Sequence, residues 1–327
     1  MLDSYQGDAP PQSGQARRPA AAPDGVSREG SAHARTDRPG SASPFGRAPR
    51  AAPDGPDMNG DAPRPDKLVV TGAGKTYDTA SGPLVAVEDF SMTVADGEFA
   101  CIVGPSGCGK TTLLWSIAGL HSLSTGRVTL DGDEIRGPHP QIGMVFQEAN
   151  LLPWRDLDRN ILLPFEIRRE KPDRARIDHL IERVGLSGFG AKFPRELSGG
   201  MQQRAAIVRA LSFNPSVLLM DEPFGALDAF TRDEMNLLVE EIWLETRKTI
   251  LFVTHNIAEA VFLSDRVFVM SARPGRLAKV FDIPFPRPRA LDLLATREVF
   301  DLVNEIKAEI QHGPGAVPAP PQEAADG

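Results

Sequence analysis

The eight residues from Gly104 to Thr111 read G-P-S-G-C-G-K-T, a complete G-x-x-x-x-G-K-T pattern. An apolar run typical of a buried strand, Phe99 to Val103, precedes the pattern, and a helix-like run, residues 112–118, follows it. Glycines in a strand-to-helix turn let backbone N–H groups close around phosphate oxygens, and the helix N-terminus adds positive potential. The loop therefore predicts a nucleotide site in which Lys110 reaches the β- and γ-phosphates and the Thr111 hydroxyl binds Mg²⁺.

A second glycine-rich segment with a lysine, Gly72 to Thr76, lacks this context. The position five before Gly74 is Val69 rather than glycine, and no apolar helix follows. We interpret this segment as a turn that contains a lysine.

Two carboxylates, Asp221 and Glu222, come directly after the apolar run Val217 to Met220. A carboxylate at the end of a core strand can hold Mg²⁺ beside Thr111, and the next one can orient or deprotonate an attacking water. An acidic turn after a strand is a common alternative. The presence of a phosphate loop in the same chain favours the catalytic interpretation, because several parts then converge on one site.

A second candidate anion site lies in residues 197–204, which read L-S-G-G-M-Q-Q-R and open a helical run. Ser198, Gly199 and Gly200 place a hydroxyl and bare backbone N–H groups at a helix N-terminus. The alternative is a plain serine cap followed by a glycine hinge. A phosphate site separate from the first one suggests that another copy of the chain completes the nucleotide site.

The ends of the chain differ in composition from its middle. Residues 1–65 are rich in Pro, Gly, Ala, Ser, Asp and Arg and hold almost no large apolar side chains, so we predict that they are disordered. They contain no apolar segment of the kind found in a secretory signal, and Met58 is an alternative start. A second polar tail, also predicted to be disordered, covers residues 313–327.

Charge and cysteine content exclude several classes of protein. The net charge is −8 and no basic stretch is interleaved with aromatic residues, so we expect no nucleic acid partner. The apolar runs are far shorter than the roughly 20 residues that span a bilayer, which predicts a soluble or peripheral protein. Cys101 and Cys108 are the only cysteines, too few for a disulfide framework or a zinc site, and they fit a reducing cytoplasm. Cys108 lies at a helix start two residues from Lys110, which predicts a lowered thiol pKa and ready alkylation, whereas Cys101 in the apolar run is predicted to be buried and inert.

Strand-like and helix-like segments alternate between the tails. Residues 68–70, 84–94, 126–130 and 142–146 read as strands, and residues 131–132 form an Asp-Gly turn. Residues 156–210 are helical in period, with breaks expected at Pro164, Pro172 and Pro194. The continuous apolar runs at 217–220 and 249–253 predict parallel core strands. The predicted class is α/β, a P-loop NTPase (RecA-like) core with an antiparallel β subdomain and a helical insertion at about 149–205.

The motifs together resemble the ATP-binding subunits of ATP-binding-cassette (ABC) transporters, over roughly residues 68–285. The resemblance implies an ATPase with ATP and Mg²⁺ as cofactors and a domain at 66–298, followed by an amphipathic helix at 299–312. It implies Glu222, His255 and Gln147 as catalytic residues, and Thr111, Gln147 and Asp221 as metal ligands. The nucleotide-binding residues that it implies are Tyr77, Gly104, Pro105, Ser106, Gly107, Cys108, Gly109, Lys110, Thr111, Thr112, Ser198, Gly199, Gly200 and Asp228.

Shorter segments resemble the nitrate, sulfonate, taurine and bicarbonate importers within this family. They are residues 107–110, 145–147, 151–154, 220–228 and 273–276. The implied protein is a homodimer on the cytoplasmic face of the bacterial inner membrane, docked to a permease near residues 148–160 and served indirectly by a solute-binding protein. The solute is expected to be a small anion or an organosulfur or nitrogen compound. Asn256 departs from the family, which usually has aspartate at that position.

Alternatives stay open at several positions. A non-transport ABC ATPase in DNA repair or translation is the second hypothesis, although long coiled-coil or zinc insertions are not evident here. A generic P-loop kinase or GTPase would not explain residues 197–204. Tyr77 either stacks on adenine or closes a strand edge. Trp154 is either a local packing anchor or part of a docking surface, and the amphipathic stripe at 291–310 favours packing over a partner site.

Overall fold

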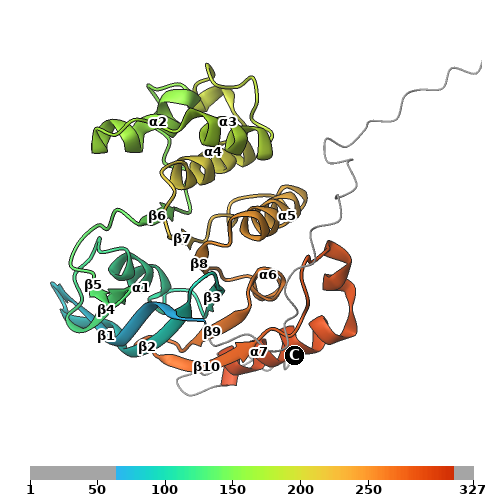
Figure 1. Ribbon diagram of the computed structural model, residues 1–327. Helices are drawn as coiled ribbons and strands as arrows, with labels where there is room; N and C mark the ends of the chain where they lie inside the picture. Colours follow the sequence, from blue (N-terminus) through green and yellow to red (C-terminus); the bar gives the residue numbers. More distant parts are fainter. Residues whose placement is uncertain (1–63, 313–327) are drawn as a thin grey trace, which may run out of the picture. The chain divides into compact units, whose positions relative to one another are not determined.

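The computed structural model describes residues 64–312. The predicted tails and Met58 lie outside this range, apart from Arg64 and Pro65 at its start. The described part holds two β-sheets and a set of helices (Figure 1). Among the described residues, no helix is both long enough and apolar enough to cross a membrane.

The smaller sheet is antiparallel and has the strand order β2-β1-β4-β5. Its strands are β1 (Asp66–Thr79), β2 (Gly82–Ala95), β4 (Thr125–Leu130) and β5 (Asp133–Glu134). The Asp-Gly turn between β4 and β5 is present as predicted, with both Asp131 and Gly132 at positive φ. Two positive φ values in succession match the twist of a tight hairpin. This sheet is the antiparallel subdomain that the sequence predicts.

The larger sheet has the order β10-β9-β3-β8-β7-β6, and all of its neighbouring pairs are parallel except β10 with β9. Its strands are β3 (Phe99–Val103), β6 (Ile142–Val145), β7 (Val217–Asp221), β8 (Thr249–Val253), β9 (Arg266–Met270) and β10 (Leu277–Asp282). Every residue of β3, β7 and β8 is buried, which explains their continuous apolar sequences. The parallel strands, with helices between them and a smaller antiparallel sheet beside them, match the predicted α/β core with its antiparallel subdomain.

Alternate residues of the central strands enter two different cores, because successive side chains of a strand point to opposite faces. Ala100 and Ile102 of β3 pack in the core that also contains the smaller sheet and helix α1 (Lys110–Ile117). Cys101 and Val103 pack in the core on the opposite face, against the remaining helices. Strand β3, which leads into the P-loop, is therefore buried on both faces, between two hydrophobic cores.

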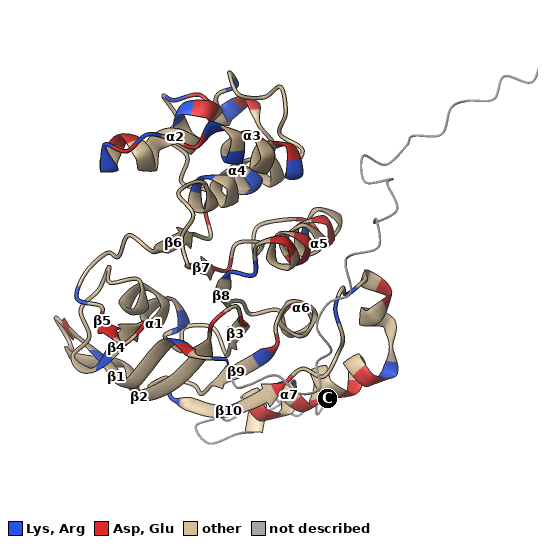
Figure 2. Ribbon diagram, viewed as in Figure 1, with Lys and Arg blue, Asp and Glu red and all other residues tan. Residues whose placement is uncertain are grey.

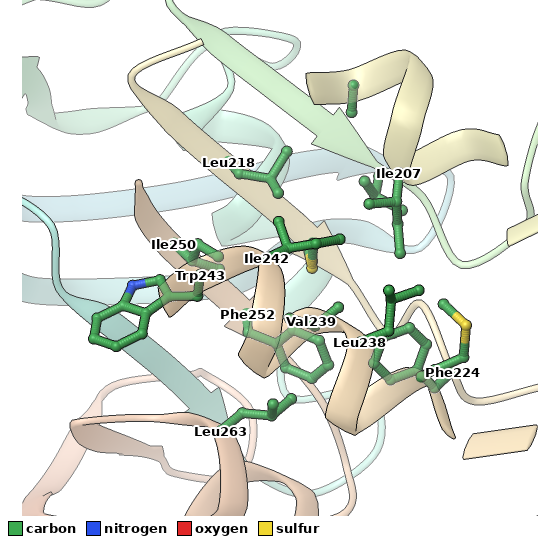
Figure 3. Close-up of a cluster of buried hydrophobic side chains, with 14 of the residues drawn as sticks. Ile207, Leu218, Phe224, Leu238, Val239, Ile242, Trp243, Ile250, Phe252 and Leu263 are labelled. Atoms are coloured by element: carbon green, nitrogen blue, oxygen red, sulfur yellow. The ribbon is translucent and has the colours of Figure 1, made fainter. Parts of the chain in front are cut away.

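The second core contains helices from three parts of the chain. They are α2 (Leu157–Arg168), α3 (Arg174–Arg183), α4 (Gly199–Ser212), α5 (Ala229–Thr246), α6 (Ile257–Leu263) and α7 (Arg297–His312), with short 3₁₀ turns at Pro194–Glu196 and Leu291–Ala295. Figure 3 shows sheet residues Leu218, Ile250 and Phe252 among the α5 residues Leu238, Val239, Ile242 and Trp243. Strands β6, β7 and β8 carry little charge, whereas α2, α3 and α7 carry both signs (Figure 2). Charge is thus concentrated on the helices around an apolar sheet.

Helix α7 packs by its apolar stripe, as the sequence favours. Val299 and Ile306 are buried, and Leu302 and Ile310 are partly buried against the same core. The exposed residues of α7 include both acidic and basic ones, among them Asp301, Glu305 and Lys307.

Two local predictions are wrong. Residues 72–76 are not a turn, because they continue β1, which pairs with β2 on one side and β4 on the other. Gly72, at φ +56°, lies where the register with β2 shifts, so the glycines mark a bulge. Pro164 does not break the helical segment but lies inside α2, where Leu157, Ile161 and Phe165 form a buried face around it. That packing outweighs the one hydrogen bond that a proline removes.

Candidate nucleotide site

The loop from Gly104 to Gly109 joins β3 to α1, as the sequence predicts. Gly107 and Gly109 have φ values of +73° and +107°, which side chains rarely adopt. A Cβ on Gly109 would lie 2.7 Å from the Ala86 carbonyl oxygen, and one on Gly104 would lie 2.7 Å from the Met270 carbonyl oxygen. Glycine at these positions therefore lets the loop pack closely between β2 and β9.

A cavity of about 220 Å³ opens above this loop. Its lining residues are Ser106, Gly107, Gly109, Lys110, Thr111, Thr112, Glu222 and Arg273. Lys110 is buried, and its Nζ donates to the carbonyl oxygens of Gly104 and Pro105 at 3.0 and 3.1 Å. The loop thus holds a buried cation at the start of a helix, which is an arrangement suited to phosphate.

Asp221 at the end of β7 faces the first turn of α1. The Thr111 hydroxyl donates to Asp221 Oδ1 at 3.0 Å, and the Trp115 indole donates to Oδ2 at 3.1 Å. Burial raises the pKa of Asp221, and the two hydrogen bonds oppose that rise. A hydroxyl and a carboxylate oxygen side by side fit Mg²⁺, which is usually held by one or two protein oxygens together with substrate phosphates and water.

Glu222 is the next residue and has a left-handed backbone, with φ +44°. Its N–H donates to the Val253 carbonyl at 2.8 Å, which fixes this conformation at the end of the sheet. The carboxylate lies 2.8 Å from His255 Nδ1 and 3.8 Å from Lys110 Nζ. Such a conformation in a non-glycine residue carries strain, and strained residues cluster at functional sites. Glu222, which lines the cavity, is therefore in contact with His255, 33 positions further along the chain.

Gln147 lies in a second cavity, of about 420 Å³. The lining residues of this cavity are Gln147, Glu148, Ala149, Asn150, Leu151, Gly199, Gln202, Gln203, Pro223, Ala226 and Leu227. A Cβ built on Gly225 would lie 3.7 Å from both Gln147 Nε2 and His255 Cε1, so the glutamine approaches the histidine. Gln147 does not line the P-loop cavity, and the side-chain hydrogen bonds of Asp221 within residues 64–312 go to Thr111 and Trp115 instead.

Ser198 is the N-cap of α4, and its hydroxyl accepts a hydrogen bond from the Met201 N–H at 3.3 Å. Ser198 and Gly199 are exposed, whereas Gly200 is buried, with a built Cβ 2.7 Å from Thr231 Cγ2. None of these residues lines the P-loop cavity. Figure 1 shows α4 in the upper, helical part of the molecule, whereas α1 lies beside the smaller sheet. Within one chain, the two predicted anion sites therefore remain separate.

Comparisons with known proteins now bear on this geometry. The family model for ABC transporters matches residues 87–225. The aliphatic sulfonates import ATP-binding protein SsuB of Bacillus licheniformis is 45% identical over 68% of this chain and 88% of its own length. The nitrate import ATP-binding protein NrtD of Synechococcus elongatus is 48% identical, over 66% of this chain and 81% of its own. The chain belongs to the ATP-binding subunits of ABC transporters.

Solved structures agree with this assignment. The dimeric structure of MJ0796, a bacterial ABC transporter cassette, matches with a TM-score of 0.60 and 30% identity, over 67% of this chain and all of that one. A post-hydrolysis structure of the same cassette, bound to ADP and phosphate, matches equally well. Members of the family hydrolyse ATP to drive transport, so this ABC subunit is an ATPase that binds ATP.

Tyr77 and Asp228 make contacts that are compatible with more than one role. The Tyr77 hydroxyl lies 3.2 Å from His121 Nδ1 and 3.5 Å from Thr112 Oγ1, and Lys75 Nζ lies 5.2 Å from the centre of its ring. Asp228 is the exposed N-cap of α5, and hydrogen bonds from Thr231 lower its pKa. Both residues keep the nucleotide-binding role as a prediction.

Cys108 differs from what its place in the P-loop suggests. The side chain is only 1% exposed and packs beneath the loop, and burial raises its pKa despite the nearby Lys110. The expectation that a helix N-terminus and a lysine would make this thiol reactive is therefore wrong, because the cost of desolvating a thiolate is larger. Cys101 in β3 is fully buried as predicted, and its pKa is also raised by burial.

The ABC subunit carries a buried glutamate behind its histidine. Glu259 on α6 is 3% exposed, and burial raises its pKa to about 7. The Thr254 hydroxyl donates to Glu259 Oε2 at 2.5 Å and accepts from the Asn256 N–H at 3.0 Å. Asn256, the departure from the family, is the N-cap of α6, and its side chain accepts from the Glu259 N–H. These bonds anchor the turn that carries His255.

Two residues of the site were missed from the sequence. Trp115 lies one helical turn after Thr111, a spacing that puts both residues on one face of α1. Arg273 lines the P-loop cavity from a loop 166 positions away, and nothing in the local sequence places it there.

The segment proposed to dock to a permease, residues 148–160, contains apolar side chains in different settings. Leu151 is buried in the core, whereas Trp154 is 70% exposed.

Proposed function

We propose that this ABC subunit is the ATP-hydrolysing component of an importer for small anionic solutes, working as a homodimer against a separate permease. The names of its relatives support the import direction, because they refer to aliphatic sulfonates, nitrate and taurine. These solutes share an anionic oxo group. A cytoplasmic position at the membrane, and indirect service by a solute-binding protein, are part of the same proposal.

In the proposed mechanism of hydrolysis, residues of the P-loop and of the end of β7 bind the nucleotide. Lys110 and the loop N–H groups bind the phosphates. Thr111 and Asp221 would hold Mg²⁺, which would offset the negative charge that develops on the phosphate groups. Glu222 orients or deprotonates the attacking water, since its carboxylate faces the cavity and lies beside both Lys110 and His255. His255 and Gln147 sense the γ-phosphate. Gln147, which lines the second cavity, would supply a further oxygen ligand to Mg²⁺.

One structural observation supports the proposed homodimer. Ser198, Gly199 and Gly200 form a helix N-terminus suited to phosphate, yet they do not line the P-loop cavity of their own chain. A second copy of the chain brings its P-loop to this surface, so that two ATP molecules lie between the two copies. Binding then closes the dimer and hydrolysis opens it, which supplies a two-state motion to the permease.

The permease contact is proposed near residues 148–160. The exposed Trp154 is its apolar centre, because Leu151 packs inward. Arg155 lies next to it and pairs with Glu166 at 2.6 Å, which leaves a charged rim beside an apolar group.

Light scattering on the Glu222→Gln variant tests the dimer. With saturating MgATP we expect twice the monomer mass, because ATP binds and is not consumed, and without nucleotide we expect the monomer. Adding Ser198→Arg should restore the monomer while ATP still binds, since the arginine obstructs only the opposite surface. A monomeric Glu222→Gln variant that is saturated with MgATP would contradict the proposal.

A further inference from the structure

The loop between β9 and β10, residues 271–276, is fastened to the smaller sheet. The Gly275 N–H donates to the Ala86 carbonyl at 3.0 Å, and the Glu88 N–H donates to the Gly275 carbonyl at 3.0 Å. Within the loop, Ser271 Oγ accepts from the Arg276 N–H at 2.9 Å and donates to the Pro274 carbonyl at 3.2 Å. This bonding holds the segment, which the sequence marks only as a subfamily signal, in one conformation.

Residues 271–276 also contact the P-loop directly. Arg273 donates to the Gly107 carbonyl through Nε at 3.0 Å and through Nη2 at 2.7 Å. Gly275 packs so closely that a Cβ there would lie 2.3 Å from the Cys108 carbonyl oxygen. Arg273 therefore reaches the middle of the P-loop from a backbone that is itself fixed.

The charges around the cavity differ in how they are satisfied. Lys110 bonds two carbonyl groups and lies 3.8 Å from Glu222. Arg276, in the same loop as Arg273, pairs with Glu88 at 2.7 Å. Within residues 64–312, Arg273 has no carboxylate partner, and its Nη1 donates no hydrogen bond. The guanidinium of Arg273 therefore lines the cavity with one nitrogen that donates no hydrogen bond and with a charge that no carboxylate pairs. Guanidinium groups bind phosphate strongly.

We propose that Arg273 is a second cation of the phosphate site: it braces the P-loop at Gly107 and donates its remaining nitrogen to a phosphate oxygen of the bound nucleotide. The proposal rests on ATP binding by the P-loop, as set out under the proposed function, and goes beyond it by adding a residue that none of the nucleotide-binding motifs contains. Because the bracing bonds go to a neutral carbonyl, they need a donor, whereas the phosphate contact needs a charge as well.

Three substitutions separate these two roles. Arg273→Gln keeps an amide donor for the Gly107 carbonyl and removes the charge, Arg273→Lys keeps the charge, and Arg276→Gln changes the same loop away from the P-loop. The probe is the non-hydrolysable analogue MgAMPPNP, and its dissociation constant is measured by isothermal titration calorimetry at low and high salt. Thermal melting of each variant reports whether the loop still folds.

We expect Arg273→Gln to weaken binding about tenfold at low salt and less at high salt, because exposed charges are screened. Arg273→Lys should recover most of the affinity, and Arg276→Gln should stay within about twofold of the wild type. Wild-type affinity in Arg273→Gln, or an equal loss in Arg276→Gln, would overturn the proposal. If the wild type itself failed to bind the analogue, the proposed function would fall first, and that result is distinct from a loss confined to Arg273.

Discussion

The Thr111 hydroxyl donates a 3.0 Å hydrogen bond to Asp221 Oδ1, which joins two motifs that lie 110 positions apart. The bond joins the first turn of α1 to the carboxyl end of β7, and Glu222 is the residue that directly follows β7. The hydroxyl of Thr111 and the carboxylate of Asp221, the pair that we propose holds Mg²⁺, therefore lie side by side next to the P-loop cavity. Their placement follows from the sheet, because β3 and β7 are both parallel neighbours of β8.

Asp221→Asn should abolish Mg²⁺-dependent hydrolysis while ATP still binds in EDTA. The amide keeps the shape and one of the two acceptor oxygens but removes the negative charge that would hold the metal, so we expect a loss of about a hundredfold or more in kcat. Phosphate release measured across a range of Mg²⁺ concentrations checks this.

Trp115→Phe is the matched control for Asp221. It removes the indole bond to Oδ2 and leaves the carboxylate in place. Its activity should fall by about tenfold at most, from the loss of one charge-assisted hydrogen bond. A loss as severe as that of Asp221→Asn would assign the effect to packing rather than to metal binding.

Sequence reasoning succeeded where the signal is local. Neighbouring residues alone are enough to predict the P-loop, the buried strands β7 and β8 and the Asp-Gly turn at 131–132. The predicted turn at Gly72 to Thr76 is wrong because pairing with β2 and β4 extends that segment as a strand. The predicted reactivity of Cys108 is wrong because its burial comes from packing with residues distant in sequence, which its motif does not reveal. Arg273 had no local signal, since its partner Gly107 is 166 positions away.

Glu259 should make the stability of the protein depend on pH between about 4.5 and 7. Its pKa is raised from 4.5 to about 7 by burial, so the folded state binds the proton more tightly than the unfolded state. Stability therefore falls as pH rises through this window, by roughly 3 kcal/mol for this group. Groups whose charges act on it include Arg232, His255 and Glu222.

Denaturant unfolding at several pH values compares the wild type with Glu259→Gln. The neutral amide has no proton to lose, so the variant should lose less stability than the wild type between pH 5 and 8. Parallel stability profiles for the two proteins would show that Glu259 does not titrate in this window.

Both cysteines should resist alkylation in the folded protein. Cys101 is fully buried and Cys108 is 1% exposed, and burial raises the pKa of each thiol. Maleimide labelling followed by mass spectrometry should give little product near neutral pH and two labels after unfolding. Rapid labelling of Cys108 in the native protein, blocked by MgATP, would instead support a reactive thiol in the loop.

Phosphate release by Glu222→Gln, measured at saturating MgATP, tests the account most directly. Glu222 faces the cavity beside Lys110 and His255, and the amide keeps its shape but cannot act as a base. The account predicts that turnover falls by about a hundredfold or more, while the dissociation constant for ATP stays within about threefold of the wild type. Turnover at the wild-type rate would contradict it, because hydrolysis would then proceed without the carboxylate that lines the P-loop cavity.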